Sequence, residues 1–285
     1  MCIAIFMWQA HPLYPLLMLQ NRDEYHNRQP ISSDSVCWVS SITPTRQVSW
    51  WENGEILGGR DEVAGGTWLA CSRDGRVALV TNVLELHTFP KAKSRGDLPV
   101  RFLEGIKSPM EYAQEVMKEA HKYNGFNLIL ADLSSKSMVY VSNRPKGEPV
   151  TIREVSPGMH VLSNAQLDSD WHKAERLRLI FERELGKNGG TEIEAADMAA
   201  KLMRDTVKAD ETRLPHICEL DWEYNLSSIF VKVDTPLGSY GTRSTAAITG
   251  TANGEVRFYE TYLEIETNSW KEHTVSFDIT KKKLK

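Results

Sequence analysis

The chain has 285 residues, of which 41% are hydrophobic and 25% are charged, and it contains eight tryptophans. These proportions are those of an ordinary globular protein, and they exclude a disordered, collagen-like or coiled-coil chain. The 34 Lys and Arg residues against 38 Asp and Glu residues give a formal net charge of −4. We therefore expect no nucleic-acid partner, because such a partner calls for a basic surface.

The four cysteines, Cys2, Cys37, Cys71 and Cys218, form no Cys-X-X-Cys pair. Their spacings are typical neither of a zinc site nor of a disulfide framework. We therefore expect a reducing compartment, no metal centre and no required cofactor.

An apolar run at the start of the chain, residues 2–19, resembles a targeting segment only superficially. No Lys or Arg precedes Arg22, and Pro12 and Pro15 interrupt the run. A signal peptide needs a positive start, and a membrane-spanning helix needs about 20 predominantly apolar residues. We expect a soluble, cytoplasmic protein without a transmembrane segment, whose mature chain begins at residue 1 or 2.

Short β-prone segments joined by turn signals dominate both ends of the chain. Asp74-Gly75 and Asn253-Gly254 each lie between two such segments and are typical of tight hairpin turns, because glycine accepts a positive φ. The first two segments form a hairpin around a Pro-containing turn. Strands are predicted over residues 2–8, 16–21, 67–71, 77–81, 127–131, 138–141, 159–162, 228–233, 245–249, 256–259 and 273–278.

Helices are predicted in the middle of the chain. The string Ser-Pro-Met-Glu at residues 108–111 has the form of a capping box, as has Thr-Glu-Ile-Glu at residues 191–194. Between these two strings, apolar side chains recur at helical spacing up to Gly186, which is expected to end that helix. The predicted helices cover residues 109–122, 171–185 and 192–203.

The order of strands, then helices, then strands predicts an α+β layered architecture. Hairpins dominate, so the sheets should be mainly antiparallel, with the helices packed on their outer faces. The sequence has neither an internal repeat nor a low-complexity linker. We expect one domain over residues 1–280, followed by a basic tail at residues 281–285.

Cys2 is the strongest single candidate for chemistry. If Met1 is removed, Cys2 carries both a thiol and a free α-amine, whose pKa of about 7.7–8.0 leaves part of it unprotonated near neutral pH. That amine can then act as the base for the thiol of the same residue. The alternative is that Cys2 is a small buried side chain that opens a strand.

Four other polar residues lie at or beside the ends of predicted strands: Asp23, Asn82, Asn164 and Arg243. An Asp that faces Cys2 could hold its ammonium group, and Asn side-chain amides serve as oxyanion donors. Arg243 could bind a carboxylate or support the nucleophile. The alternatives are a solvated turn for Asp23, turn formation for the two Asn residues and a surface charge for Arg243.

Two further signals are weak. Gly58-Gly59 and Gly65-Gly66 lack the spacing of a phosphate-binding loop and are expected to be loop glycines. The basic stretch at residues 91–95 could meet an anionic ligand, and a solvated loop is the alternative.

Several strings taken together resemble one known family. They are Met-Cys-Ile-Ala-Ile-Phe at residues 1–6, Asn-Arg-Asp-Glu at 21–24, Gly-Gly-Thr-Trp-Leu-Ala at 65–70, Leu-Ser-Asn-Ala at 162–165 and Tyr-Gly-Thr-Arg-Ser at 240–244. They look like the NRDE-domain family, also called the transport and Golgi organisation family, which takes its first name from the Asn-Arg-Asp-Glu string. The resemblance spans nearly the whole chain.

That family is in turn similar to N-terminal-nucleophile hydrolases of the bile-salt hydrolase and penicillin V acylase type. The similarity implies a four-layer αββα sandwich. By the same similarity Cys2 matches the nucleophile, and Asp23 matches an Asp that contacts the N-terminal amine. Asn82 and Asn164 match two Asn positions near the oxyanion, and Arg243 matches an active-site Arg.

One position departs from the acylase pattern. The acylases place an Arg three residues before the Asp, where this chain has Gln20. Arg22 is adjacent to Asp23 instead and would point to the opposite face of an extended strand. We therefore expect the Cys2 thiolate to lack one positive neighbour, and we assign Arg22 and Trp68 to substrate binding.

The resemblance leaves two functions open. The first is a hydrolase in which Cys2 attacks an amide, ester or thioester. The second is a non-catalytic carrier of haem, an acyl-CoA or another lipid-like anion, with a role in trafficking and Golgi organisation. For either function we expect a small-molecule acyl, lipid-like or haem ligand, with peripheral membrane association and a location at the Golgi or mitochondria as options.

Overall fold

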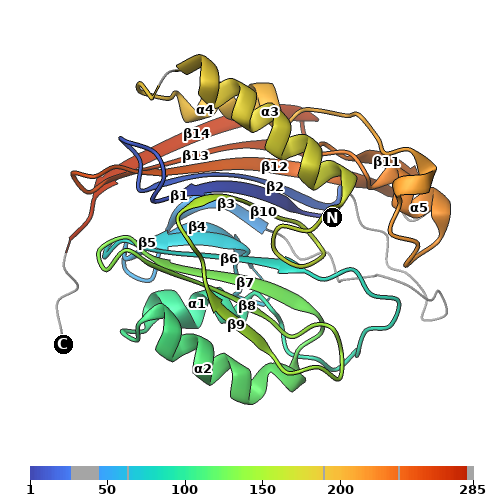
Figure 1. Ribbon diagram of the computed structural model, residues 1–285, viewed down its shortest axis with the longest axis horizontal. Coiled ribbons are helices and arrows are strands. Elements are labelled where there is room, and N and C mark those ends of the chain that lie inside the picture. Colours follow the sequence, from blue (N-terminus) through green and yellow to red (C-terminus); the bar gives the residue numbers. More distant parts are fainter. Residues whose placement is uncertain (27–44, 63, 189, 237, 281–285) are drawn as a thin grey trace.

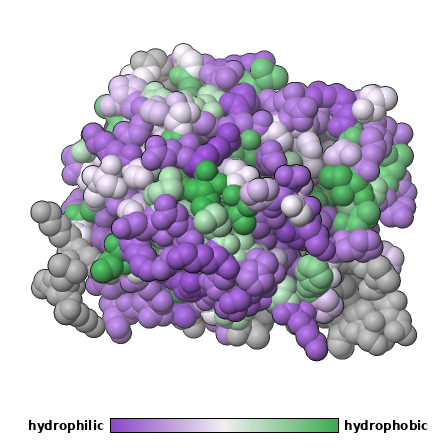
Figure 2. Space-filling model, turned by 60° about the horizontal axis from the view of Figure 1, so that its bottom comes forward, coloured by the Kyte–Doolittle hydropathy of each residue, from purple (hydrophilic) through white to green (hydrophobic). Residues whose placement is uncertain are grey.

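The computed structural model describes residues 1–26, 45–62, 64–188, 190–236 and 238–280. Within these residues two antiparallel sheets are stacked face to face, with helices on both outer faces (Figure 1). The layers run helix, sheet, sheet, helix, so the predicted αββα sandwich is confirmed. Figure 2 shows hydrophilic side chains over most of one face of the molecule, with smaller hydrophobic patches between them.

The first sheet contains both ends of the described chain. Its strands lie in the order β10-β1-β2-β12-β13-β14, and β11 pairs with β12. The bounds are β1 (Ile3–Trp8), β2 (Leu16–Tyr25), β10 (Gly158–Leu162), β11 (Lys232–Thr235), β12 (Gly238–Gly250), β13 (Glu255–Glu264) and β14 (Ser269–Asp278). All six residues of β1 are buried, because the strand lies between β10 and β2 and between two layers.

The second sheet is formed by the chain between these two parts of the first sheet. Its strands follow sequence order, from β3 to β9, so each is joined to its neighbour by an antiparallel connection. The bounds are β3 (Thr45–Trp51), β4 (Ile56–Asp61), β5 (Leu69–Ser72), β6 (Arg76–Asn82), β7 (Phe126–Asp132), β8 (Ser137–Ser142) and β9 (Thr151–Glu154). The Asp74-Gly75 turn joins β5 to β6, and Gly75 has a φ of +87° there.

Three hydrophobic clusters fill the spaces between the layers. One lies between the sheets and includes Phe6, Trp8 and Ile248. A second joins the first sheet to α3 (His172–Asn188) and α4 (Ala195–Leu202), and a third joins the second sheet to α1 (Asp97–Glu104) and α2 (Pro109–Glu119). Short helical segments complete the fold: η1 (Ala120–Lys122), η2 (Glu211–Arg213) and α5 (Leu220–Asn225).

The three helices predicted in the middle of the chain are present as α2, α3 and α4, but some of their predicted ends are wrong. The Ser108 capping box forms as expected at the start of α2. The box predicted at residues 191–194 does not open α4, which begins at Ala195 after Glu194 without a side-chain cap. Gly186 does not end α3, which continues to Asn188. One glycine costs a helix only about 1 kcal/mol, so packing overrides it.

Several predicted strand assignments also need correction. The strand expected at residues 228–233 begins only at Lys232. Gly58 and Gly59 lie inside β4 rather than in a loop. The strand predicted at residues 16–21 is longer, because β2 continues through the Asn-Arg-Asp-Glu string to Tyr25. The boundaries of the domain predicted over residues 1–280 stay a prediction, and Cys37 and the tail at 281–285 lie outside the described residues.

The glycine at position 58 allows β4 and β5 to pack closely. A Cβ atom at Gly58 would lie 2.5 Å from the Cβ of Ala70 and 2.7 Å from the carbonyl oxygen of Leu69. Gly58→Ala is therefore expected to lower the free energy of unfolding by about 1–3 kcal/mol, the usual cost of overpacking. Urea unfolding followed by tryptophan fluorescence measures this loss.

Gly186→Ala is the matched control for that substitution. No atom lies within 4 Å of a Cβ built at Gly186, and the residue is inside a helix. The control is expected to gain about 0.5–1 kcal/mol, because alanine is the better helix former. Equal stabilities for the two variants would contradict this account of β4 packing.

Candidate active site

The N-terminus, which directly precedes β1, lies at an open pocket of about 610 Å³. Residues from distant parts of the chain line this pocket, including four of the predicted catalytic residues. The lining residues are Met1, Cys2, Asp23, Glu24, Tyr25, Asn82, Val83, Leu84, Asn164, Trp222, Leu226 and Tyr240. The structure therefore brings Cys2, Asp23, Asn82 and Asn164 together at one pocket.

The α-amine of Met1 is bound at the inner end of this pocket. Its nitrogen lies 3.0 Å from Oδ2 of Asp23, whose side chain is fully buried. The same amine donates a hydrogen bond of 2.6 Å to the hydroxyl oxygen of Tyr240. Burial lowers the pKa of the amine, and the negative charge of Asp23 opposes that shift.

Asp23 itself is fixed from a neighbouring strand. The hydroxyl of Thr242 in β12 donates a hydrogen bond of 2.7 Å to Oδ1 of Asp23. Because β2 and β12 pair antiparallel with Asp23 opposite Thr242, the register of the sheet sets this contact. One carboxylate oxygen thus anchors the side chain and the other faces the amine.

The thiol of Cys2 is partly enclosed beside the amine. Burial raises the pKa of the thiol, while the positive N-terminus lowers it and the charge of Asp23 raises it. The carbonyl of Cys2 accepts a hydrogen bond of 3.0 Å from the hydroxyl of Ser163. With Met1 present, the thiol is therefore held mostly in its protonated form.

The two Asn residues come from different sheets. Asn82 ends β6, and Asn164 follows β10 by two residues. The side-chain amide of Asn164 donates a hydrogen bond of 2.7 Å to the carbonyl of Asn82, and the carbonyl of Asn164 accepts one of 2.8 Å from the backbone of Leu84. These bonds join the two sheets at the wall of the pocket.

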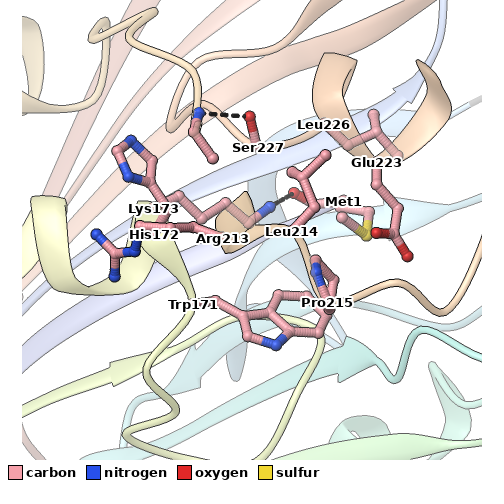
Figure 3. Close-up of a pocket in the computed structure, with 11 residues that line it drawn as sticks. Met1, Trp171, His172, Lys173, Arg213, Leu214, Pro215, Glu223, Leu226 and Ser227 are labelled. Carbon is pink, nitrogen blue, oxygen red and sulfur yellow. Dashed lines mark hydrogen bonds between the residues drawn. The ribbon is translucent and has the colours of Figure 1, made fainter. Parts of the chain in front are cut away.

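Lys173 is a functional candidate that the sequence analysis missed. Its side chain is only 2% exposed, and Nζ donates a hydrogen bond of 3.2 Å to the carbonyl of Met1 (Figure 3). Burial lowers the pKa of Lys173 to about 8, and the charges of Asp23 and Cys2 oppose that shift. Lys173 precedes Leu177 and Phe181 at intervals of four residues, so helical spacing could have placed it on the buried face.

A second, smaller pocket adjoins the first. It has a volume of about 310 Å³, and Met1 and Leu226 line both pockets. The side chains of Trp171, Leu214 and Pro215 make its wall largely apolar (Figure 3). Met1 therefore lies between the two pockets, and its amine occupies the position next to Asp23.

Three predicted site residues lie outside the lining of these pockets. Arg243 sits at a bulge in β12, where the register with β2 shifts between Thr242 and Ser244. Burial lowers the pKa of Arg243 to about 10. Arg22 stacks on the ring of Trp68, with its guanidinium carbon 4.0 Å from the ring centroid.

The expectation that the Cys2 thiolate lacks one positive neighbour, because Gln20 replaces an Arg, stays a prediction. In the pairing of β1 with β2, Ile3 lies opposite Asn21 and Ala4 opposite Gln20, which makes Arg22 the next residue toward Cys2. The charge of Arg22 lowers the pKa of the Cys2 thiol. Gln20 lies deeper, is 1% exposed, and neither atom of its amide has a hydrogen-bond partner among the described residues.

Among the described residues, no group of three or more His, Cys, Asp or Glu side chains is arranged to hold a metal ion. The lining of the Cys2 pocket offers a thiol, an amine, a carboxylate and amide donors. These groups are the ones that acyl transfer through a covalent intermediate requires.

Lys173 gives the site a pH dependence that stability measurements can detect. Its pKa is about 8 in the folded chain and 10.5 when solvated. Between these values the unfolded chain binds more protons at Lys173 than the folded chain, so this residue makes the free energy of unfolding rise with pH. Relative to Lys173→Met, the original chain should gain about 2–3 kcal/mol between pH 7.5 and 10.5 in urea unfolding. A pH-independent difference between the two proteins would contradict the burial of this lysine.

Comparison with known proteins identifies the family. The sequence pattern of the family described as "Transport and Golgi organisation 2" matches residues 1–265. The mouse "Transport and Golgi organization 2 homolog" is 33% identical, with 98% of this chain and 99% of that protein covered. The human homolog is 31% identical over the same shares.

A solved structure shows the same fold. The C2A mutant of the conjugated bile acid hydrolase from Clostridium perfringens aligns over 96% of each chain with a TM-score of 0.50 and 11% identity. At that identity the likeness shows the fold alone, which is that of the N-terminal-nucleophile hydrolases. On the family match and the two homologs, the chain belongs to the Transport and Golgi organisation 2 family.

Proposed function

We propose that this protein is a Cys2-dependent hydrolase of an amide, ester or thioester, and that it becomes active when Met1 is removed. One observation carries the proposal: the N-terminal amine is buried against Asp23, directly beside the Cys2 thiol. Loss of Met1 would make Cys2 the N-terminal residue. Asp23 and Tyr240 would then be available to hold the new amine.

The amine would be the base of the reaction. Burial lowers the pKa of the N-terminal amine at this position, and the nearby positive charge of Lys173 lowers it further. Because its pKa lies below the usual value of about 8, a larger fraction of this amine is neutral near neutral pH than of a solvated amine, and the neutral form can accept a proton. The amine of Cys2 would take the thiol proton as sulfur forms a bond to the carbonyl carbon of the substrate.

The amides of Asn82 and Asn164 would stabilise the resulting oxyanion. Asn82 has an exposed side chain at the pocket, and Asn164 is held by its bonds to Asn82 and Leu84. An oxyanion donor of this kind contributes about 2.7–4 kcal/mol to transition-state stabilisation. The protonated amine would then give its proton to the leaving nitrogen, oxygen or sulfur, and water would release the acyl group from Cys2.

A carrier of haem, an acyl-CoA or another lipid-like anion is the second candidate. Retention of Met1 would favour it, because burial raises the thiol pKa and Met1, rather than Cys2, would then supply the amine next to Asp23. The family name points to a trafficking role, and a location at the Golgi with peripheral membrane association would follow from such a role. No helix among the described residues is long and apolar enough to cross a membrane.

Cys2→Ala separates the two functions. Turnover of an acyl thioester or N-acyl amide should fall by at least about a thousandfold, because the nucleophile is lost. Binding of the uncleaved substrate should be retained. Intact-mass measurements should show loss of Met1 from the active protein and a transient acyl adduct on Cys2.

Cys218→Ala is the matched control, since Cys218 is also a partly exposed cysteine but is not part of the pocket lining. Its turnover should equal that of the unmodified chain. Full activity of Cys2→Ala, or full activity of protein that retains Met1, would overturn the proposed role of Cys2. Ligand binding without turnover by the unmodified chain would favour the carrier.

A further inference from the structure

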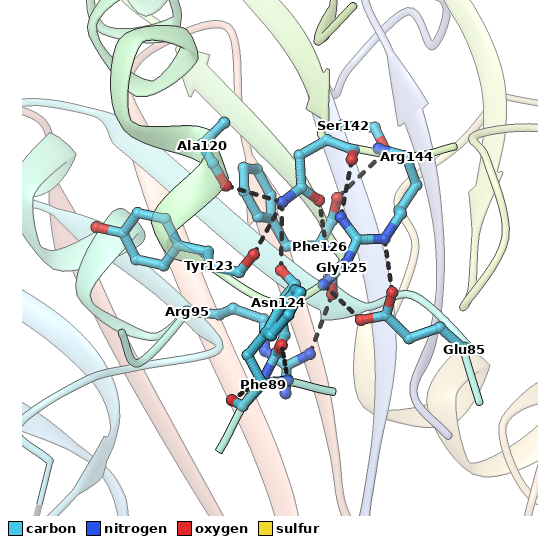
Figure 4. Close-up of polar contacts among 11 residues, drawn as sticks. Glu85, Phe89, Arg95, Ala120, Tyr123, Asn124, Gly125, Phe126, Ser142 and Arg144 are labelled. Carbon is cyan, nitrogen blue, oxygen red and sulfur yellow. Dashed lines mark hydrogen bonds and ion pairs between the residues drawn. The ribbon is translucent and has the colours of Figure 1, made fainter. Parts of the chain in front are cut away.

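A polar cluster lies beside Val83 of the Cys2 pocket, around the backbone of Gly125. The chain leaves the pocket after Asn82, passes through Val83, Leu84 and Glu85, and returns through Arg95 to the start of α1. Figure 4 shows that Glu85, Arg95 and Arg144 surround the backbone of Gly125. Arg95 belongs to the basic stretch at residues 91–95, to which the proposed hydrolase gives no role.

The carboxylate of Glu85 is fully engaged in this cluster. One oxygen lies 2.6 Å from Nε of Arg144, and the other accepts a hydrogen bond of 2.7 Å from the backbone of Gly125. Arg144 also donates to the carbonyl of Asn143 at 2.9 Å. Glu85 and Arg144 therefore neutralise each other.

Arg95 has no such carboxylate. Its one side-chain hydrogen bond in the described part of the chain runs from Nη1 to the carbonyl of Gly125 at 3.0 Å. A guanidinium group carries five donors, so most of them are unused. Burial lowers the pKa of Arg95 to about 10, and the charge of Glu85 only partly offsets that shift.

The position of Arg95 relates it to the pocket. The same carbonyl oxygen of Gly125 accepts a hydrogen bond of 3.0 Å from the backbone of Val83, which lines the pocket. The charges of Arg95 and the Cys2 thiolate also interact. The shared acceptor places the Arg95 guanidinium beside Val83 of the pocket lining.

The acids that line the pocket already have cationic partners. Asp23 pairs with the Met1 amine at 3.0 Å, and Glu24 pairs with Arg22 at 3.6 Å. Arg95 is thus a cation near the nucleophile that no acid of the described chain contacts directly. A ligand anion would satisfy its unused donors.

We propose that Arg95 binds an anionic group, a carboxylate or a phosphate, on the molecule that occupies the Cys2 pocket. Planar guanidinium groups bind such oxyanions through paired, charge-assisted hydrogen bonds. The inference deepens the proposed function, since it rests on the Cys2 pocket being the substrate site. It assigns the substrate class as an acyl compound with a negative charge close to the scissile carbonyl.

Two alkylating agents that differ only in charge test this assignment without requiring turnover. Iodoacetate carries a carboxylate where iodoacetamide carries a neutral amide, and both modify the Cys2 thiolate. The ratio of their two rates at Cys2, measured by peptide mass spectrometry, cancels any change in the thiol pKa. Arg95→Met should lower this ratio on the order of tenfold, because a charge-assisted contact is lost.

Arg95→Lys keeps the charge and should retain most of the ratio. Arg153→Met is the remote control, since Arg153 is exposed on β9, and its ratio should equal that of the unmodified chain. An unchanged ratio in Arg95→Met, or an equal fall in Arg153→Met, overturns the proposal. If Cys2→Ala proves the hydrolase wrong, the alkylation ratio still decides whether Arg95 recognises anions.

A competition experiment on the unmodified chain provides a second test of the Arg95 proposal, which does not depend on the folding of any variant. Butyrate or inorganic phosphate should slow the labelling of Cys2 by iodoacetate. Protection by butyrate identifies a carboxylate as the anion, and protection by phosphate identifies a phosphate. Absence of protection by both competitors overturns the proposal.

Discussion

The ion pair between the Met1 amine and Asp23 is the interaction on which the geometry of the site depends. The Asp23 carboxylate has no solvent exposure, and Thr242 holds it in place from the adjacent strand. Removing one partner of a buried pair of this kind typically costs about 3–5 kcal/mol, because the other charge is left uncompensated. Lys173 provides a second cation in the same space. The first residue of the chain is therefore held by an ion pair to Asp23, a hydrogen bond to Tyr240 and a hydrogen bond from Lys173.

The sandwich supplies the rest of the site through the ends of its strands. Asn82 ends a strand of the second sheet, whereas Asn164 follows a strand of the first. The side chain of Asn164 donates a hydrogen bond to the carbonyl of Asn82, and the backbone of Leu84 donates one to the carbonyl of Asn164. These two bonds connect the two sheets at the pocket. Packing between the sheets, centred on residues such as Phe6 and Trp8, keeps these strand ends within reach of Cys2. A catalytic or binding constellation mounted on two packed sheets is more rigid than one carried by loops.

The layered fold and four of the site residues could be predicted from the sequence because their signals are local. Asp74-Gly75 and Asn253-Gly254 mark hairpins, and the string at residues 21–24 marks the family. The errors arose where long-range packing decided the outcome. The same polar string continues β2 because β12 pairs with it, and Gly186 remains helical because α3 packs on the first sheet. The position of Arg22 relative to Cys2 depended on the register of two strands, which no single segment reveals.

The burial of the N-terminal amine has a practical consequence for anyone who handles this protein. A purification tag or fluorescent protein fused ahead of Met1 converts the amine into an uncharged amide and forces a peptide through the space enclosed by Asp23 and Tyr240. Such a fusion reports on an altered molecule, both in enzyme assays and in images of its location in cells. At the other end, Thr280 is bound to the carbonyl of Arg73 beside the turn between β5 and β6. Labels belong after that residue, where they leave the amine and its carboxylate intact.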